Sequence, residues 1–441
     1  MIELFGIPIL FFSFFTLSTL VFLFNVSPFR YSQIVILFAV FSFVVRPISS
    51  ALCDTFYSFY YFDKTLYIEG VYISLAYFFF YMMGLILFVR RKINLVPVTI
   101  NILEIKRLLT LLLIIILFVD IACLVVFGVA ILPGIRTTGL SKAASGAQVF
   151  FAVTSSLTFV ATALCVLLLI QDKKSLMSSL IKLCLCFALS MIFYQRGSFI
   201  MGGIFGLFLV ACIDRNALFK DIFRKIVLFV SLTLVILYGR TLVSQAIAII
   251  FPQDTNFTEF VKYEQPLECK ISNKANQEHD QVWPTLITYT EQEGYDFYKN
   301  IIASISRPFL SADDREKYGL MTSVDTLNIF NDRDTYLNKN FGFSLSVVHY
   351  HYYSIGLVSV LFAFFLGSIT SLLENKMYVH ELGRRGILKL AIIYQIILLF
   401  NSAFDERLKW VVINILLITI VIKFLYPIIY REKNVSFNNS Q

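Results

Sequence analysis

Four side chains that suit phosphate and proton chemistry lie inside long apolar runs or at their ends. Arg196 precedes a glycine between two such runs, Arg240 lies deep inside another, and His349 and His351 follow a long polar segment. A guanidinium group keeps its charge and offers a bidentate fork to phosphate oxygens. An imidazole titrates near neutral pH and suits proton transfer or hydrogen bonding to phosphate. These residue types therefore predict an anionic, phosphate-bearing ligand.

Each arginine also has a purely structural interpretation. Asp120 and Arg240 both fall deep inside apolar runs, where ionisable groups are costly. An ion pair of Asp120 with Arg240 or Arg46 would hold helices together. Arg196 could equally anchor a turn by extending its charge to the membrane surface. The functional interpretation places Arg240 on the floor of an outward-facing cavity that binds an anion, and it is compatible with the ion pair.

The two histidines alternate with tyrosines in the run His349-Tyr350-His351-Tyr352-Tyr353. Histidines spaced i, i+2 on a helix point apart, and no third ligand has a suitable spacing, so we expect no metal. Tyrosine is common at membrane boundaries whatever the function of the protein. Histidine is not, which makes these two side chains the better functional candidates.

A second short polar stretch, Asp405-Glu-Arg407, separates the last two apolar runs. It predicts an outer turn between two helices. One interpretation is a solvated hairpin tip, and the other is a polar contact of Asp405 and Arg407 with a sugar.

The composition defines the class of protein. The 441 residues are 58% hydrophobic and only 15% charged, with a mean hydropathy of +0.76, whereas soluble domains are about 25% charged. Runs of about 20 apolar residues recur, each long enough to cross a bilayer as a helix. We therefore expect an all-α polytopic membrane protein. The net charge of +8 reflects basic loops on one side of the membrane and does not indicate nucleic-acid binding.

The apolar runs predict 11 membrane-spanning helices, or 12 if one has been missed. They lie near 5–24, 32–50, 71–89, 108–130, 147–170, 176–194, 198–213, 226–250, 346–370, 387–403 and 410–430.

Orientation follows from the lysine and arginine residues of the loops. Loops and run ends on one side hold 18 of them and the short loops on the other side hold 6. The basic side is predicted to be cytosolic, which puts the N-terminus outside and the C-terminus inside. The first apolar run lacks the basic flank of a signal peptide and is expected to be retained.

Four regions follow from this layout: a bundle of about eight helices over 1–250, an outer segment over 251–345, about three helices over 346–430, and a cytosolic tail over 431–441. The outer segment carries 9 basic and 15 acidic residues. Its apolar groups predict short helices packed over the outer face, one of them beginning at 311–314. Cys53 and Cys269 both fall outside and either pair or remain free thiols.

The layout resembles a known family. About a dozen spans, the Arg196-Gly197 break, a large late outer loop and the re-entry His351-Tyr-Tyr-Ser-Ile-Gly356-Leu-Val-Ser359 are similar to Wzy-type bacterial O-antigen and oligosaccharide repeat-unit polymerases. Many relatives carry an acidic residue where this chain has His351 and a second glycine where it has Ser359. The related O-antigen ligases place a histidine just before this span, which resembles His349 or His351.

The resemblance implies a metal-independent, cofactor-free membrane glycosyltransferase with a C-type glycosyltransferase fold. Its substrate would be undecaprenyl-pyrophosphate-linked oligosaccharide at the periplasmic face of the bacterial inner membrane. The sugar of one lipid-linked repeat would attack the anomeric carbon of a lipid-linked chain, and undecaprenyl pyrophosphate would leave. A chain-length regulator of the Wzz type, a flippase and membrane lipids are the implied partners.

The resemblance also suggests roles for individual residues. Arg196 and Arg240 would stabilise the departing pyrophosphate, and His349 or His351 would serve as a base. Arg307 and Arg315 would clamp the second pyrophosphate. Rings that could stack on sugars belong to Trp283, Tyr350, Tyr352 and Tyr353.

Three alternatives stay open. An O-antigen ligase would use the same chemistry with lipid A-core as acceptor. A transferase that uses lipid-monophosphate sugars would need a carboxylate in the first outer loop, where Asp54 and Asp63 are available. A polysaccharide or lipid flippase would show paired half-repeats and short loops, and the long outer segment argues against it.

Overall fold

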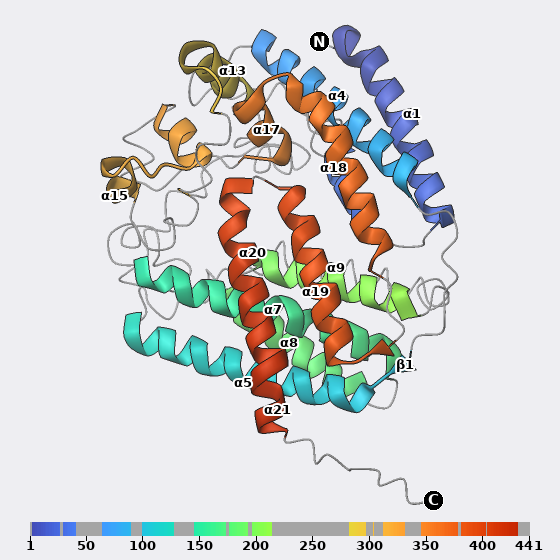
Figure 1. Ribbon diagram of the computed structural model, residues 1–441, viewed down its shortest axis with the longest axis vertical. Coiled ribbons are helices and arrows are strands. Elements are labelled where there is room, and N and C mark those ends of the chain that lie inside the picture. Colours follow the sequence, from blue (N-terminus) through green and yellow to red (C-terminus); the bar gives the residue numbers. More distant parts are fainter. Residues whose placement is uncertain are drawn as a thin grey trace, which may run out of the picture.

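The computed structural model describes residues 2–26, 30–40, 64–89, 99–127, 145–172, 176–192, 196–213, 282–296, 303, 312–330, 345–377, 381–402 and 404–430. Within these ranges the chain is helical apart from turns and two two-residue strands (Figure 1). The predicted run 226–250 lies outside the described residues.

The helices follow the apolar runs of the sequence. In chain order they are α1 (Ile2–Val26), α2 (Tyr31–Val40), α4 (Lys64–Phe88), α5 (Ile102–Phe127), α7 (Ser145–Gln171), α8 (Leu176–Ile192), α9 (Arg196–Ile213), α13 (Val282–Glu293), α15 (Ala312–Lys317), α17 (Val347–Ile355), α18 (Val358–Asn375), α19 (Arg384–Phe400), α20 (Phe404–Thr419), a π-helical turn (Ile420–Leu425) and α21 (Tyr426–Ile429).

Six of the described helical stretches are long and apolar enough to cross a membrane, and two shorter apolar helices accompany them. The six lie within α1, α4, α5, α7 and α18 and across α20 to α21. The protein is therefore an all-α membrane protein, as the composition predicted. The total of 11 spans and the orientation remain predictions.

The helices form two groups with separate apolar cores. One core joins α1, α2, α4, α13, α17 and α18, and the other joins α5, α7, α8, α9, α19, α20 and the start of α2. In Figure 1 the first group occupies the upper half, whereas α5 and α7 run across the α19–α20 pair in the lower half. Residues of α2 enter both cores, so this helix connects the two groups.

Glycines allow two helix pairs to pack closely. A Cβ atom on Gly84 of α4 would overlap the carbonyl oxygen of Phe364, and one on Gly367 of α18 would overlap that of Tyr81. Gly202 and Gly206 bring α9 against the backbone of α7 in the same way. Small residues at such crossings replace the hydrophobic driving force that helices lack inside lipid.

Ion pairs join helix ends that the basic-residue count predicts to be cytosolic. Strand β1 (Thr99–Ile100) pairs in parallel with β2 (Glu381–Leu382). Beside this pairing, Glu104 at the start of α5 lies 3.3 Å from Arg384 at the start of α19, and Lys106 lies 2.5 Å from Asp172. These contacts join residues that are far apart in the sequence, and they hold α5, α7 and α19 together.

Two local predictions were wrong. The apolar run 346–370 is not one span: α17 ends at Ile355, Gly356 adopts a left-handed φ of 60°, and α18 begins at Val358. Hydropathy cannot detect this break because apolar residues continue across it. The stretch 405–407 is not a turn but the first turn of α20.

The predicted short helices of the long polar segment are confirmed. They are α13, α15 and a helix over 323–330. Helix α15 begins at Ala312, as the cluster Ser311-Ala-Asp-Asp indicated. Helix α13 packs on α4 and α17 and thereby links this segment to the helices that carry the candidate residues.

Candidate functional site

Helix α17 carries the histidine and tyrosine side chains and packs against α13 and α18, and its His351 ring also lies near Tyr77 of α4. His349 is 1% exposed and His351 is 4% exposed. The backbone N–H of Ser346 donates to His349 Nδ1 at 3.2 Å, and the Ser346 hydroxyl lies 3.0 Å from the same nitrogen. The imidazole thus satisfies a free N–H of the first helical turn, as a glutamate does in a capping box.

This contact determines the tautomer of His349. A backbone N–H can only donate, so Nδ1 is the acceptor and the proton of the neutral ring is on Nε2. His349 therefore presents a hydrogen-bond donor, not a proton acceptor, on the other side of its ring.

His351 lies on the opposite side of α17. Its ring is stacked near that of Tyr77 of α4, with centroids 6.2 Å apart, and meets Phe362 of α18 edge-on at 5.3 Å. Burial lowers the pKa of His351 to about 3, because the charged form loses its hydration. In this arrangement His351 is neutral at physiological pH and is a weak base.

Trp283 occupies the junction of α13, α4 and α17. Its ring meets His349 and Tyr352 edge-on, with centroid distances of 4.7 Å and 5.3 Å. A Cβ atom on Gly70 of α4 would overlap the indole ring, so only glycine admits the tryptophan here. The predicted span 71–89 did not include Gly70. Helix α4 begins seven residues before that span, at Lys64, and therefore contains this glycine.

Tyr353 and the segment after α13 complete the aromatic cluster. Tyr353 stacks on Tyr289 of α13 with centroids 5.5 Å apart. Tyr295 packs against Gly356, where a Cβ atom would overlap its ring, and the Asp296 N–H donates to the Tyr353 carbonyl at 3.2 Å. Burial raises the pKa of Tyr353 above its ordinary value, so the phenol is neutral.

The structure brings together one part of the predicted site. His349 and Tyr352 both contact Trp283, and His351, Tyr350 and Tyr353 lie on the same short helix. The remaining candidates are placed as follows: Arg196 begins α9, Arg315 lies in α15, Asp405 and Arg407 lie in the first turn of α20, and Arg240 and Arg307 lie outside the described residues.

The ion pair predicted for Asp120 and the disulfide predicted for Cys53 involve residues outside the described ranges. Asp120 is buried in α5, and neither carboxylate oxygen has a hydrogen-bond partner within the described ranges. Its proposed partners Arg46 and Arg240, and the candidate disulfide of Cys53 with Cys269, lie outside those ranges. Within them, no three His, Cys, Asp or Glu side chains are grouped so that they could hold a metal ion.

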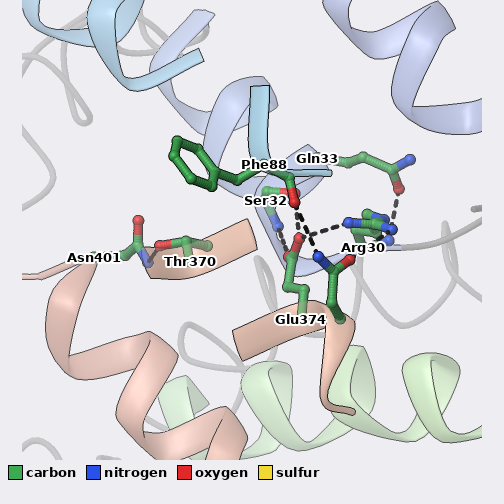
Figure 2. Close-up of polar contacts among 8 residues, drawn as sticks. Arg30, Ser32, Gln33, Phe88, Thr370, Glu374 and Asn401 are labelled. Atoms are coloured by element: carbon green, nitrogen blue, oxygen red, sulfur yellow. Dashed lines mark hydrogen bonds and ion pairs between the residues drawn. The ribbon is translucent and has the colours of Figure 1, made fainter. Parts of the chain in front are cut away.

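A buried polar cluster that the sequence did not predict joins α2 to α18 (Figure 2). Glu374 of α18 accepts hydrogen bonds from the N–H of Ser32 at 2.7 Å and from its hydroxyl at 2.9 Å. Arg30 lies 3.6 Å from Glu374, and both side chains are 2% exposed. Arg30 had entered the prediction only as a basic loop residue, and Glu374 lies at the end of an apolar run with no local signal of its partner.

A second set of hydrogen bonds continues beside this cluster. The Tyr81 hydroxyl donates to Asn401 Oδ1 at 2.6 Å. Asn401 Nδ2 in turn donates to the Thr370 hydroxyl at 3.0 Å (Figure 2). The turn between α19 and α20 is therefore bonded to α4 and α18. This bonding ties the two helix groups to each other.

A third set of polar contacts lies within the second helix group. The hydroxyl of Ser155 contacts that of Ser198, two residues after the start of α9. The neighbouring Ser156 bonds to Asn414 of α20, whose amide donates to Gln395 of α19 at 3.0 Å. These bonds connect α9, α7, α20 and α19 near Arg196.

Comparison of the chain with protein-family models, with curated proteins and with solved structures finds no match. We therefore infer function from the residues of this chain and their contacts. The cluster on α17 offers aromatic rings, neutral phenols and imidazoles with a defined donor, which suits hydrogen bonding to a hydroxyl-rich ligand more than proton abstraction.

Proposed function

We propose that this protein is a membrane glycosyltransferase that polymerises undecaprenyl-pyrophosphate-linked oligosaccharide repeat units. The observation that carries the proposal is the cover of α17, with its two histidines and three tyrosines, by α13 of the long polar segment. The resemblance to Wzy-type polymerases rests on the same region, and the positive φ of Gly356 agrees with a glycine in the re-entry motif.

In the proposed reaction, a hydroxyl oxygen of the acceptor sugar forms a bond to the anomeric carbon of a lipid-linked chain. The bond from that carbon to the pyrophosphate oxygen breaks, and undecaprenyl pyrophosphate leaves with the electron pair. The hydroxyl proton passes to solvent or to the leaving phosphate. Arg196 and Arg240 stabilise the charge on the leaving group, and Arg307 and Arg315 hold the second pyrophosphate.

The described geometry supports a different role for the histidines than that of a base. Nδ1 of His349 is occupied by Ser346, and the low pKa of His351 makes it a poor proton acceptor near neutral pH. We assign both to hydrogen bonding with sugar hydroxyls, with Tyr350, Tyr352 and Tyr353 as ring contacts and Asp405 and Arg407 as outer polar contacts.

We propose in addition that the protein has about 11 spans in a C-type glycosyltransferase arrangement and that its site faces the periplasm at the bacterial inner membrane. It would work together with a chain-length regulator and a flippase. A ligase that transfers polymer to lipid A-core is the second candidate, because a ligase also carries a histidine just before this span, as His349 stands here.

Deletion of the gene tests the proposal. The lipopolysaccharide of the source strain is separated on a gel before and after deletion and after complementation. Loss of a polymerase leaves core with a single repeat. Loss of a ligase instead leaves core without any repeat while lipid-linked polymer accumulates, and an unchanged ladder would refute both candidates.

A further inference from the structure

Trp283 fills a space that is walled by groups suited to a sugar. The indole is 1% exposed and lies over Gly70, with the rings of His349 and Tyr352 meeting it edge-on. Gly70 leaves room for a flat ring, the imidazole carries a donor at Nε2, and the phenol can donate or accept. A sugar ring has the thickness and hydroxyl groups to take the same place.

The indole does not satisfy this space completely. Its nitrogen is buried and has no hydrogen-bond partner among the residues that the structure describes. Buried tryptophan N–H groups usually find an acceptor, and an unpaired buried donor destabilises the arrangement that contains it. The unpaired indole N–H therefore makes the packing of Trp283 against α4 and α17 less stable than its ring contacts alone would make it.

Helix α13 is short and ends at a glycine. It has 12 residues, which gives it a length of about 18 Å. Gly294 follows it with a φ of 83°, and a Cβ atom there would meet nothing within 4 Å, so the space around this residue is open. The chain after it is anchored by Tyr295 against Gly356 and by the Asp296 N–H on the Tyr353 carbonyl. Trp283 is the second residue of α13, at the end of the helix opposite Gly294. Figure 1 shows α13 at the edge of the upper helix group.

We propose that α13 is a lid and that Trp283 holds the place of a sugar ring of the acceptor when no substrate is bound. Rotation at Gly294 withdraws the indole from Gly70 and presents His349 and Tyr352 to the sugar. The nature of the ligand rests on the proposed function, whereas the movement of the lid rests on the contacts of α13.

Fluorescence tests the movement directly, because the chain has two tryptophans. Trp410→Phe leaves Trp283 as the single reporter in full-length protein in detergent. We expect blue-shifted emission and little quenching by acrylamide. Lipid-linked oligosaccharide extracted from the gene-deleted source strain should raise the quenching constant at least twofold, and undecaprenyl pyrophosphate without sugar should not. A constant that stays the same with saturating oligosaccharide, or that rises equally with both lipids, overturns the proposal.

Two glycine variants in the same background test whether Trp283 occupies the space beside Gly70. Gly70→Ala places a methyl group in the indole ring, whereas Gly203→Ala meets nothing within 4 Å. We expect Gly70→Ala to raise acrylamide quenching of Trp283 without any sugar and Gly203→Ala to leave it unchanged. Equal quenching of Trp283 in folded preparations of both variants would show that the indole does not lie against Gly70.

A disulfide lock serves if Gly70→Ala fails to fold. A Cβ atom on Gly70 would lie 2.5 Å from the Cβ of Trp283, so cysteines at both positions can be joined after a shift of about 1 Å. The closed arrangement predicts that this disulfide forms readily under mild oxidation, and that lipid-linked oligosaccharide slows its formation at least twofold while undecaprenyl pyrophosphate does not. A rate of cross-linking that saturating oligosaccharide leaves unchanged would refute the lid.

The two proposals fail in different ways. The quenching measurement needs no polymerisation. If Trp283 quenching responds to lipid-linked oligosaccharide but gene deletion leaves the ladder unchanged, the lid is supported and the polymerase is refuted.

If the protein elongates chains but Trp283 quenching does not respond, the polymerase is supported and the lid is refuted.

Discussion

Glu374 at the end of α18 caps the first turn of α2 by accepting two hydrogen bonds from Ser32, 342 residues away in the chain. Arg30 occupies the N-cap position, where Ser, Thr, Asp or Asn would normally supply an acceptor. Its backbone N–H instead donates to Gln33 Oε1 at 2.8 Å, and Glu374 satisfies the next free donor. The charge of Arg30 offsets the buried carboxylate.

We expect Glu374→Ala to lower the free energy of unfolding by about 3 kcal/mol, because it leaves Arg30 buried without its counter-charge and removes a helix cap. Glu374→Gln keeps one acceptor oxygen and should lose less. Unfolding in mixed micelles by a denaturing detergent measures both. Adding Arg30→Gln to Glu374→Gln should recover part of the loss, and strictly additive effects would contradict a coupled pair.

Close packing of α4 on α18 gives a second prediction. Gly367→Ala drives a methyl group into the carbonyl of Tyr81, where backbone cannot yield easily, and should cost about 1–3 kcal/mol. Gly203→Ala, in open space on α9, is the matched control. Thermal unfolding in detergent compares the two, and equal midpoints would show that the two helices are farther apart than described.

His351 predicts a pH dependence. Its pKa in the folded protein, about 3, lies below the 6.5 of an unfolded histidine, so only the unfolded state takes up a proton between these values. Stability is full above pH 6.5 and falls as pH decreases, by roughly 2 kcal/mol between pH 6.5 and 5.

His351→Phe should remove this dependence while keeping an aromatic ring near Tyr77 and Phe362. Denaturation at pH 6.5, 5.75 and 5 of both proteins isolates the effect, because His349 is present in each. Parallel profiles would mean that His351 is solvated in the folded protein.

Asp120 distinguishes two arrangements of the membrane-spanning helices. Its oxygens have no hydrogen-bond partner within the described ranges, and replacing an unpaired buried polar group by an apolar one is nearly neutral or stabilising. An unpaired buried polar group costs about 1–3 kcal/mol, so we expect Asp120→Leu to leave the free energy of unfolding unchanged or to raise it by up to about 3 kcal/mol. A loss of several kcal/mol would instead support an ion pair with Arg46 or Arg240, because that cation would then be left uncompensated.

The proposed pyrophosphate contacts predict a loss of activity without a loss of protein. Arg196→Ala and Arg240→Ala should reduce long chains by about 100-fold or more, as removal of a transition-state charge contact does. Arg107→Ala, an equal change of charge at the start of α5, should leave the ladder intact. Polysaccharide gels read with immunoblots of the membrane fraction measure both, and wild-type ladders from the first two variants would refute the clamp.

Much of the helix layout was predictable from the sequence. Runs of apolar residues placed α1, α7, α8, α9 and α19 within a few residues of their observed ends. A segment that crosses lipid must satisfy its own backbone hydrogen bonds as a helix and must be mostly apolar along its length. The short helices of the polar segment were also predictable, since local caps such as those near Ala312 act within one turn.

The candidate residues were predictable by type but not by arrangement. The sequence pointed to Trp283, His349 and His351 because these side chains are rare and lie beside a membrane boundary. It did not indicate that Ser346 occupies Nδ1 of His349, or that a glycine in the extra turns of α4 receives the tryptophan. The first is a local contact in which histidine stands where a capping box normally has glutamate or glutamine. The second depends on the packing of α4, α13 and α17.

By itself, the sequence determined an all-α membrane protein with a large polar insertion and a histidine–tyrosine stretch at its exit, because hydropathy and local capping act over one helix at a time. Tertiary structure alone decided the break at Gly356, the cap that Glu374 provides to α2, and the closure of α13 over α17. These features depend on the sign of one dihedral angle and on contacts between residues far apart in the chain, and neither leaves a periodic trace in the sequence.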